Sequence, residues 1–148
     1  MMDVVLYTRQ NCPLCEEAKA TLLEAGIKPR EVDVDTDLDL LRRFDEHVPV
    51  IFVDGSEAFR HRIEWRVVDR HHLEREFRFK NFADALAFTN RIGEIAERLN
   101  HHPDIALGWG RVRVTTWTHD AGGITPLDFK LAGAIEAISS SAAAQSAR

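Results

Sequence analysis

Three histidines and two carboxylates lie at fixed intervals in the second half of the chain. Glu97 stands four residues before His101, and His102 follows directly. His119 and Asp128 come further along the chain. Histidine has an ordinary pKa of about 6.5 and can donate or accept a proton near neutral pH, while a carboxylate can orient its ring. These residues predict acid–base chemistry if the fold brings them to one pocket.

A second candidate site is the run Cys12-Pro13-Leu14-Cys15, which contains both cysteines of the chain. A pair this close closes almost no loop and would contribute little as a structural cross-link. Pro13 stands where a first helical turn would begin, so Cys12 is expected at a helix N-terminus, where the helix dipole stabilises a thiolate. The pattern predicts redox chemistry with Cys12 as nucleophile and Cys15 as resolving partner. An inert, reduced pair is the alternative.

The elements expected around the cysteines alternate between strand and helix. A short buried strand at 4–7 precedes a helix that ends at Gly26, and 31–35 alternates like a strand with one buried face. A second short helix is expected at 38–44 and a third strand at 50–53. This order predicts an α/β sheet, with the cysteines where the first strand meets the first helix.

The second half of the chain predicts four strands and two helices. The strands are expected at 65–69, 73–79, 105–109 and 112–118. Asn81 and Thr125 are expected to cap the helices that follow them. Pro103 forces the preceding residue out of helical geometry, so the first helix should end at Asn100, just before the histidine pair. His71 and His72 are expected in a turn that faces solvent.

The charge of the chain is unevenly distributed. Residues 1–64 carry 8 basic and 14 acidic side chains, whereas residues 65–148 carry 11 and 10. The asymmetry indicates two units joined near residue 64, and the lack of a basic cluster argues against a nucleic-acid binder. No apolar stretch approaches the roughly 20 residues that span a bilayer, and no signal peptide is evident, so no membrane contact and a cytoplasmic location are expected. Residues 139–148 are expected to be a flexible tail.

The spacing E-x3-H-H-P-x5-W-x9-H-x8-D, from Glu97 to Asp128, resembles the signature of the pterin-4a-carbinolamine dehydratase family without a gap. The resemblance covers about residues 65–138, where an α+β unit with an antiparallel four-stranded sheet covered by helices is expected. It implies a lyase that removes water from 4a-hydroxytetrahydrobiopterin, or a related 4a-hydroxypterin, to give quinonoid dihydropterin in tetrahydrobiopterin recycling. No metal or organic cofactor is implied.

The resemblance also implies roles for individual residues. His101 and His119 would exchange protons with the hydroxyl group, and His102 would hold the pterin and is a candidate base. Glu97, one helical turn before His101, is expected either to orient it or to raise its pKa through the nearby negative charge. The expected substrate contacts are Pro103, Trp109, Thr118 and Asp128, the last of which should also cap its own helix. A metal held by the three histidines is disfavoured because adjacent histidines point in different directions.

Residues 3–63 resemble the glutaredoxin-like branch of the thioredoxin superfamily. The matching features are Tyr7-Thr8-Arg9 before the cysteines and Val48-Pro49-Val50, which corresponds to the family's Val-Pro element. The resemblance implies a thioredoxin-like fold in residues 1–64, a cis-Pro49 beside the cysteines, and thiol–disulfide exchange. The last helix usual in this family is missing, as is the usual first helix of the dehydratase family, so the two units are expected to pack on each other.

The partners that the resemblances imply are a small pterin, a second copy of the chain in a homodimer or homotetramer, and a pterin-dependent aromatic amino acid hydroxylase. Two alternatives to a dehydratase remain open. One is a non-catalytic dimerisation or binding protein, and the other is a disulfide reductase that uses the second unit as an oligomerisation scaffold.

Overall fold

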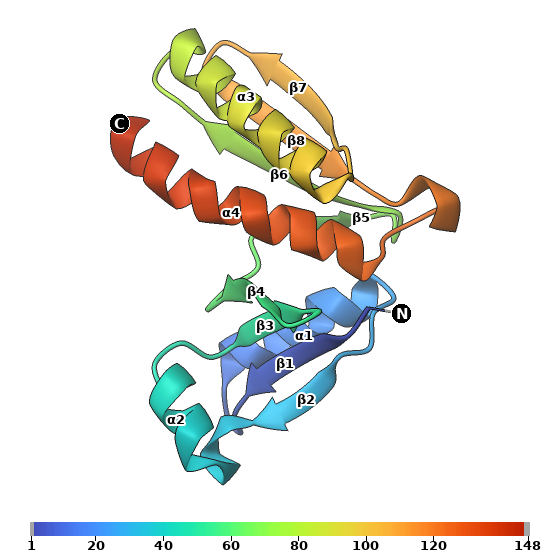
Figure 1. The fold of residues 1–148 in the computed structure, drawn as a ribbon, viewed down its shortest axis with the longest axis vertical. Helices are drawn as coiled ribbons and strands as arrows, with labels where there is room; N and C mark the ends of the chain where they lie inside the picture. The colour runs from blue at the N-terminus through green and yellow to red at the C-terminus, as the bar shows by residue number, and fades with distance from the viewer. Residues whose placement is uncertain (1, 147–148) are drawn as a thin grey trace.

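The chain contains two four-stranded sheets, and the long helix α4 (Pro126–Ser146) lies between them (Figure 1). The computed structural model describes residues 2–146, and the side chains of residues 2–139. The first sheet contains β1 (Val4–Thr8), β2 (Arg30–Asp33), β3 (Val50–Val53) and β4 (Ser56–Arg60). The second contains β5 (Arg66–Val68), β6 (His72–Arg78), β7 (Asp104–Gly108) and β8 (Arg111–Thr116). The helices are α1 (Pro13–Glu24), α2 (Leu38–Phe44), α3 (Phe82–Leu99) and α4 (Pro126–Ser146), with short 3-10 turns η1 (Val34–Thr36) and η2 (His119–Ala121).

The first sheet has the strand order β2-β1-β3-β4. Strands β1 and β2 are parallel and are connected through α1, whereas β3 and β4 each run antiparallel to the strand before them in the sheet. Along β3, Ile51 and Val53 face the main core, and Val50 and Phe52 pack on the other face with Phe44 of α2. This sheet is the mixed α/β arrangement that the sequence predicts. Strand β4 is an addition, because the expected elements ended at residue 53.

The second sheet has the order β5-β6-β8-β7, and every neighbouring pair is antiparallel, as expected. Helix α3 lies against β7 and β8, and α4 lies against β6 and α3. Phe88 of α3 packs on Phe77 of β6, with ring centroids 4.9 Å apart. The two helices therefore bury their apolar faces against this sheet.

Helix α4 also packs against the first sheet. It contacts β3 and β4, and Figure 1 shows it running between the two sheets. Phe129 of α4 meets Phe59 of β4 with ring centroids 6.3 Å apart. Buried side chains from both units form one continuous core that also includes Ala18 and Leu22 of α1. The expected packing of the two units is thus confirmed, and α4 covers the sheet face that α1 also covers.

The C-terminal end of α4 differs from the prediction. The helix continues to Ser146, so residues 139–146, expected as a flexible tail, belong to it. Residues 147–148 and the side chains beyond Ser139 lie outside the described part of the chain. Among the helices of residues 2–146, none combines the length and apolar character that crossing a bilayer requires.

Candidate active site

The C-terminal end of α3 positions the histidine pair. Asn100 adopts a left-handed conformation with φ 53°, and the backbone N–H of His101 bonds to the carbonyl oxygen of Ala96 at 3.1 Å. Such a residue ends a helix and redirects the chain. The helix therefore ends at Asn100, as predicted, with His101 buried and His102 exposed.

His101 packs against a fully buried carboxylate. Its Nε2 lies 2.6 Å from Oδ1 of Asp128, in the first turn of α4. The carboxylate also accepts hydrogen bonds from the hydroxyls of Thr116 at 2.6 Å and Thr118 at 2.8 Å, and from the backbone N–H of Thr125 at 2.9 Å. The bond that Asp128 accepts from the Thr125 N–H is the cap of α4 that was expected of Asp128. The network thus joins the end of α3, the end of β8 and the start of α4.

His102 forms a second imidazole–carboxylate pair, on the surface. Its Nε2 lies 2.5 Å from Oε2 of Glu97. Both side chains line an open cavity of about 910 Å³, together with Pro103, Ile105 and one face of α3. A ligand in this cavity would contact the His102–Glu97 pair directly.

The pairing of Glu97 corrects the prediction from the helical repeat. Four-residue spacing would place Glu97 beside His101 only if the helix continued through both residues. Because the chain leaves helical geometry at Asn100, His101 turns toward Asp128, and Glu97 bonds to His102 instead.

His119 lies in η2 and is exposed. Its ring stacks on Trp117, with centroids 4.8 Å apart and planes 31° apart. Its neighbour Thr118 belongs to the Asp128 network. Within residues 2–139, no hydrogen bond links the His119 ring to His101 or His102. His119 is associated with His101 and His102 by the sequence motif and by its neighbour Thr118, which bonds to Asp128.

His71 and His72 are less exposed than the sequence predicts. His72 is the first residue of β6, and both rings are partly buried against Trp117, with centroids 5.2 Å and 6.1 Å from it. The expectation of a solvent-facing turn is therefore wrong for His72, which packs within the sheet.

Two further residues, Thr116 and Trp117, belong to the site although the motif does not contain them. Thr116 is fully buried and follows Val112 and Val114 on the inner face of β8. A hydroxyl on such a face needs a hydrogen-bond partner. Buried and exposed residues alternate along β8, and this alternation is the sequence signal that identifies Thr116 as a buried polar residue.

Trp109 lies at the opposite end of the β7–β8 hairpin from the histidine pair. Its side chain is 74% exposed in the turn that follows Gly108. His101 precedes Asp104, and Asp104 pairs with Thr115 at the other end of the hairpin. At about 3.3 Å per strand residue, the length of β7 separates Trp109 from the Asp128 network. Thr118 and Asp128 are in direct contact, and Pro103 and His102 line the same cavity. Trp109 neither bonds to this network nor lines the cavity.

The cysteines form a disulfide at the start of α1. Cys12 is the N-cap residue, Pro13 follows at the first helical position, and Cys12 Sγ accepts a hydrogen bond from the Cys15 N–H at 3.2 Å. The expected placement at a helix N-terminus is confirmed. The Val48–Pro49 bond is cis, as expected, and Pro49 directly precedes β3, which pairs with β1.

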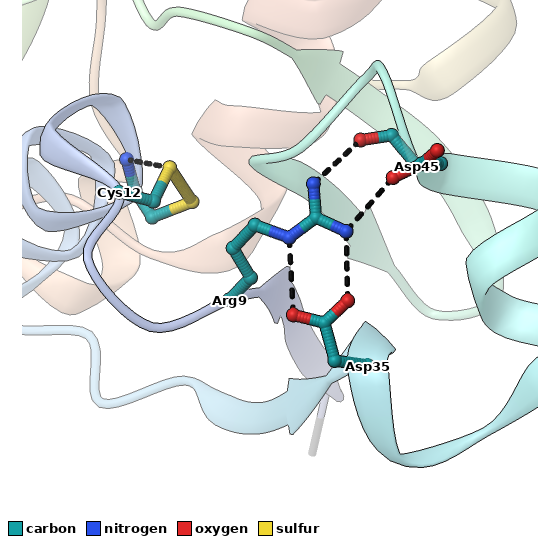
Figure 2. The surroundings of a disulfide bond; sticks show 5 residues. Arg9, Cys12, Asp35 and Asp45 are labelled. Atoms are coloured by element: carbon teal, nitrogen blue, oxygen red, sulfur yellow. Dashed lines mark hydrogen bonds and ion pairs between the residues drawn. A yellow bond between two sulfur atoms is a disulfide. The ribbon is translucent and has the colours of Figure 1, made fainter.

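Arg9 lies beside the disulfide and points away from it (Figure 2). Its guanidinium bonds to both carboxylate oxygens of Asp35, at 2.8 Å and 3.1 Å, and to Asp45 Oδ1 at 2.9 Å. Hydrogen bonding, to Asp35 first and Asp45 second, holds the pKa of Arg9 above its usual value. The bond to Arg9 lowers the pKa of Asp35. Two aspartates thus neutralise this cation and tie the turn before Cys12 to η1 and the end of α2.

Across the described residues, no three His, Cys, Asp or Glu side chains are grouped as a metal site would require. The side chains gathered at the end of α3 are instead two separate imidazole–carboxylate pairs. Such pairs can transfer protons, because each carboxylate orients its ring and leaves the other ring nitrogen free.

Two family models match the chain, and each covers more than half of it. The pterin 4 alpha carbinolamine dehydratase family matches residues 54–138. The glutaredoxin-like domain family matches residues 3–78. The matches overlap at β4, β5 and β6, where the two units join.

Individual relatives agree with the first match. A protein of Rubrobacter xylanophilus with the provisional name pterin-4-alpha-carbinolamine dehydratase is 56% identical over 72 residues, which are 49% of this chain and 67% of that protein. An equally named protein of Alkaliphilus metalliredigens is 51% identical over 73 residues, or 49% of this chain and 66% of that one. The chain thus spans about two thirds of the length of these relatives.

One solved structure, a transcriptional coactivator/pterin dehydratase from Brucella melitensis, is 39% identical, with a TM-score of 0.48 and coverage of 51% of this chain and 81% of that one. From the two family matches, the chain belongs to the pterin 4 alpha carbinolamine dehydratase family and carries a domain of the glutaredoxin-like family at its N-terminal end.

Proposed function

We propose that the second unit removes water from a 4a-hydroxytetrahydropterin, such as 4a-hydroxytetrahydrobiopterin, and releases quinonoid dihydropterin as part of tetrahydrobiopterin recycling. The observation that carries the proposal is the pair of adjacent histidines, each bonded to its own carboxylate, at the end of α3. Family membership supports the substrate class.

The reaction needs one proton donor and one proton acceptor. The C4a–O bond breaks as the hydroxyl takes up a proton and leaves as water. N5 loses its proton, and its electron pair forms the N5=C4a double bond. The protein ends the cycle with no net gain or loss of protons. Imidazoles suit both transfers near neutral pH.

In this proposal His101 and His119 exchange protons with the hydroxyl, and His102 holds the pterin and takes the proton from N5. The exposure of the His102–Glu97 pair in the cavity supports direct contact with substrate. Pro103 would supply an apolar wall. Thr118 and Asp128 would support the site through their mutual bond, while a substrate contact of Trp109 rests on the resemblance alone.

The proposal also includes self-association as a homodimer or homotetramer. A pterin-dependent aromatic amino acid hydroxylase is the proposed source of the 4a-hydroxypterin. Both statements rest on the family resemblance rather than on a contact in this chain.

Matched histidine variants test the assignment. Replacement of His102 by Asn should lower kcat/KM for dehydration by about 100-fold or more, because general acid–base groups contribute about that factor. His61→Asn replaces an exposed histidine of the first unit and should keep the wild-type rate. Equal rates for both variants would contradict the role of His102, and a wild-type rate no faster than buffer would favour a non-catalytic binding protein.

A second activity is supported by the disulfide at the N-terminus of α1. We propose that the reduced first unit reduces substrate disulfides. The Cys12 thiolate attacks a disulfide sulfur and forms a mixed disulfide, and one substrate thiolate leaves. The Cys15 thiolate then attacks Cys12 Sγ, which releases the second thiolate and regenerates the Cys12–Cys15 bond.

The two cysteines should differ when they are replaced singly. The Cys12→Ser variant should lose reduction of a small aromatic disulfide, whereas Cys15→Ser should accumulate the mixed disulfide on Cys12. Reduction that survives in Cys12→Ser would contradict this activity. Dehydration should be unchanged in both variants, which separates the two functions.

A further inference from the structure

Asp128 is a hydrogen-bond acceptor saturated by protein donors. The Thr118 hydroxyl and the Thr125 N–H donate to its Oδ2, and the Thr116 hydroxyl donates to its Oδ1. An ionised carboxylate only accepts hydrogen bonds. With Asp128 ionised, the remaining contact of Oδ1, with His101 Nε2 at 2.6 Å, requires a proton on that ring nitrogen.

Thr116 makes a second contact with the same nitrogen. A threonine hydroxyl has one proton, and here it is directed to Asp128 at 2.6 Å. Thr116 Oγ1 also lies 3.4 Å from His101 Nε2. Since its own proton is used, this oxygen can only accept from Nε2–H.

The other ring nitrogen of His101 remains free. Within the described residues, Nδ1 of His101 has no hydrogen-bond partner. Among these residues, Nδ1 of His47 is the side-chain atom that is both fully buried and without a partner, so Nδ1 of His101 is not fully buried. Nδ1 of His101 therefore retains access to solvent, although the side chain as a whole is 10% exposed. In the neutral ring with Nε2–H, this Nδ1 carries the lone pair.

We propose that Thr116 is a positioning residue of the dehydratase site: with Asp128 it holds His101 in the Nε2–H tautomer and leaves Nδ1 as the atom that exchanges a proton with the substrate. Thr116 touches no substrate and acts through His101. The inference rests on the proposed dehydration for its effect on rate, but the tautomer itself does not depend on any activity.

Nitrogen NMR of the full chain, labelled with ¹⁵N-histidine, tests the tautomer directly. The His101 signals are assigned by their loss in His101→Gln. In the neutral ring, the wild type should show a protonated Nε2 and an unprotonated Nδ1. A protonated Nδ1 in the wild type would overturn the proposal, whether or not the chain dehydrates a pterin.

Variants of β8 test the contribution of Thr116. Thr116→Val keeps the shape of the side chain and should lower kcat by about tenfold with little change in KM, because a hydrogen bond to a charged group is lost. Thr116→Ser restores the hydroxyl and should recover most of the rate. Thr115→Val, its neighbour on the other face of β8, should keep the wild-type rate.

Loss of the rate in both Thr116→Ser and Thr116→Val would show a packing role and contradict the proposal. A wild-type kcat in Thr116→Val would contradict it as well. If the wild type shows the Nε2–H tautomer but does not dehydrate pterins, the proposed function fails while the tautomer assignment stands.

Discussion

A β-carbon on Gly133 would lie 2.8 Å from the Cα and the carbonyl carbon of Ala58, and closer still to the carbonyl oxygen. No real β-carbon comes so close to backbone atoms, so only glycine allows α4 to lie directly on β4. Helix α4 begins at the Asp128 network and passes over the first sheet at this point. The dehydratase site and the glutaredoxin-like unit thus share one helix.

Gly133→Ala should destabilise the protein although alanine favours helix. The added methyl group would force α4 away from β4, at a cost of about 1–3 kcal/mol in the free energy of unfolding. Gly93→Ala, in the interior of α3, is the matched control, since a β-carbon added there would meet no atom within 4 Å. That control should gain up to about 1 kcal/mol. Urea unfolding measures both, and equal stabilisation of the two variants would contradict the close contact.

The two units should unfold together. Phe129 of α4 packs on Phe59 of β4, the same helix also contacts β3, and buried side chains of both units form one core. Removing one unit would therefore expose the core of the other. NMR signals of Tyr7 in the first unit and of the Trp65 indole should disappear at the same urea concentration. Two separate midpoints would show independent units.

The Arg9–Asp35 pair should make stability depend on pH. Because Arg9 lowers the pKa of Asp35 in the folded state, the pair stabilises the fold above the unfolded pKa of about 3.9, and this stabilisation is lost as the pH falls through the lower folded pKa. Asp35→Asn should therefore lower Tm at pH 7 and have less effect below about pH 3. A Tm difference from the wild type that does not change with pH would contradict the pairing.

Trp117 should act through His119, whose ring it supports. Trp117→Leu removes the flat surface and should lower kcat for dehydration by about tenfold, because small misplacements of a catalytic group are costly. Trp117→Phe keeps an aromatic surface and should recover most of the rate. If the leucine and phenylalanine variants are equally active, the stacking does not position His119.

The sequence allowed the second sheet and much of the site to be predicted because their determinants are local. Helix α3 ends at Asn100 because of the residues around it, and the cap by Asp128 depends on three-residue spacing. The pairing of Glu97 was missed because the left-handed Asn100 interrupts the repeat on which the prediction depended.

Other features depend on contacts between distant segments. Thr116 reaches Asp128 only after β8 and α4 pack together, and Gly133 has its role only because β4 lies beneath it. Strand β4 was not predicted, since only Phe59 among its residues is buried. Contacts between segments far apart in the sequence form only when the core assembles, so the local hydrophobic pattern does not predict them.

The most direct test is the rate at which a synthetic 4a-hydroxytetrahydropterin loses water, followed by stopped-flow absorbance at neutral pH. The control is free imidazole at the concentration of the three site histidines. The purified chain should accelerate dehydration well beyond imidazole, and the rate should saturate with substrate. A rate equal to that of imidazole at every protein concentration would contradict a histidine-catalysed dehydratase.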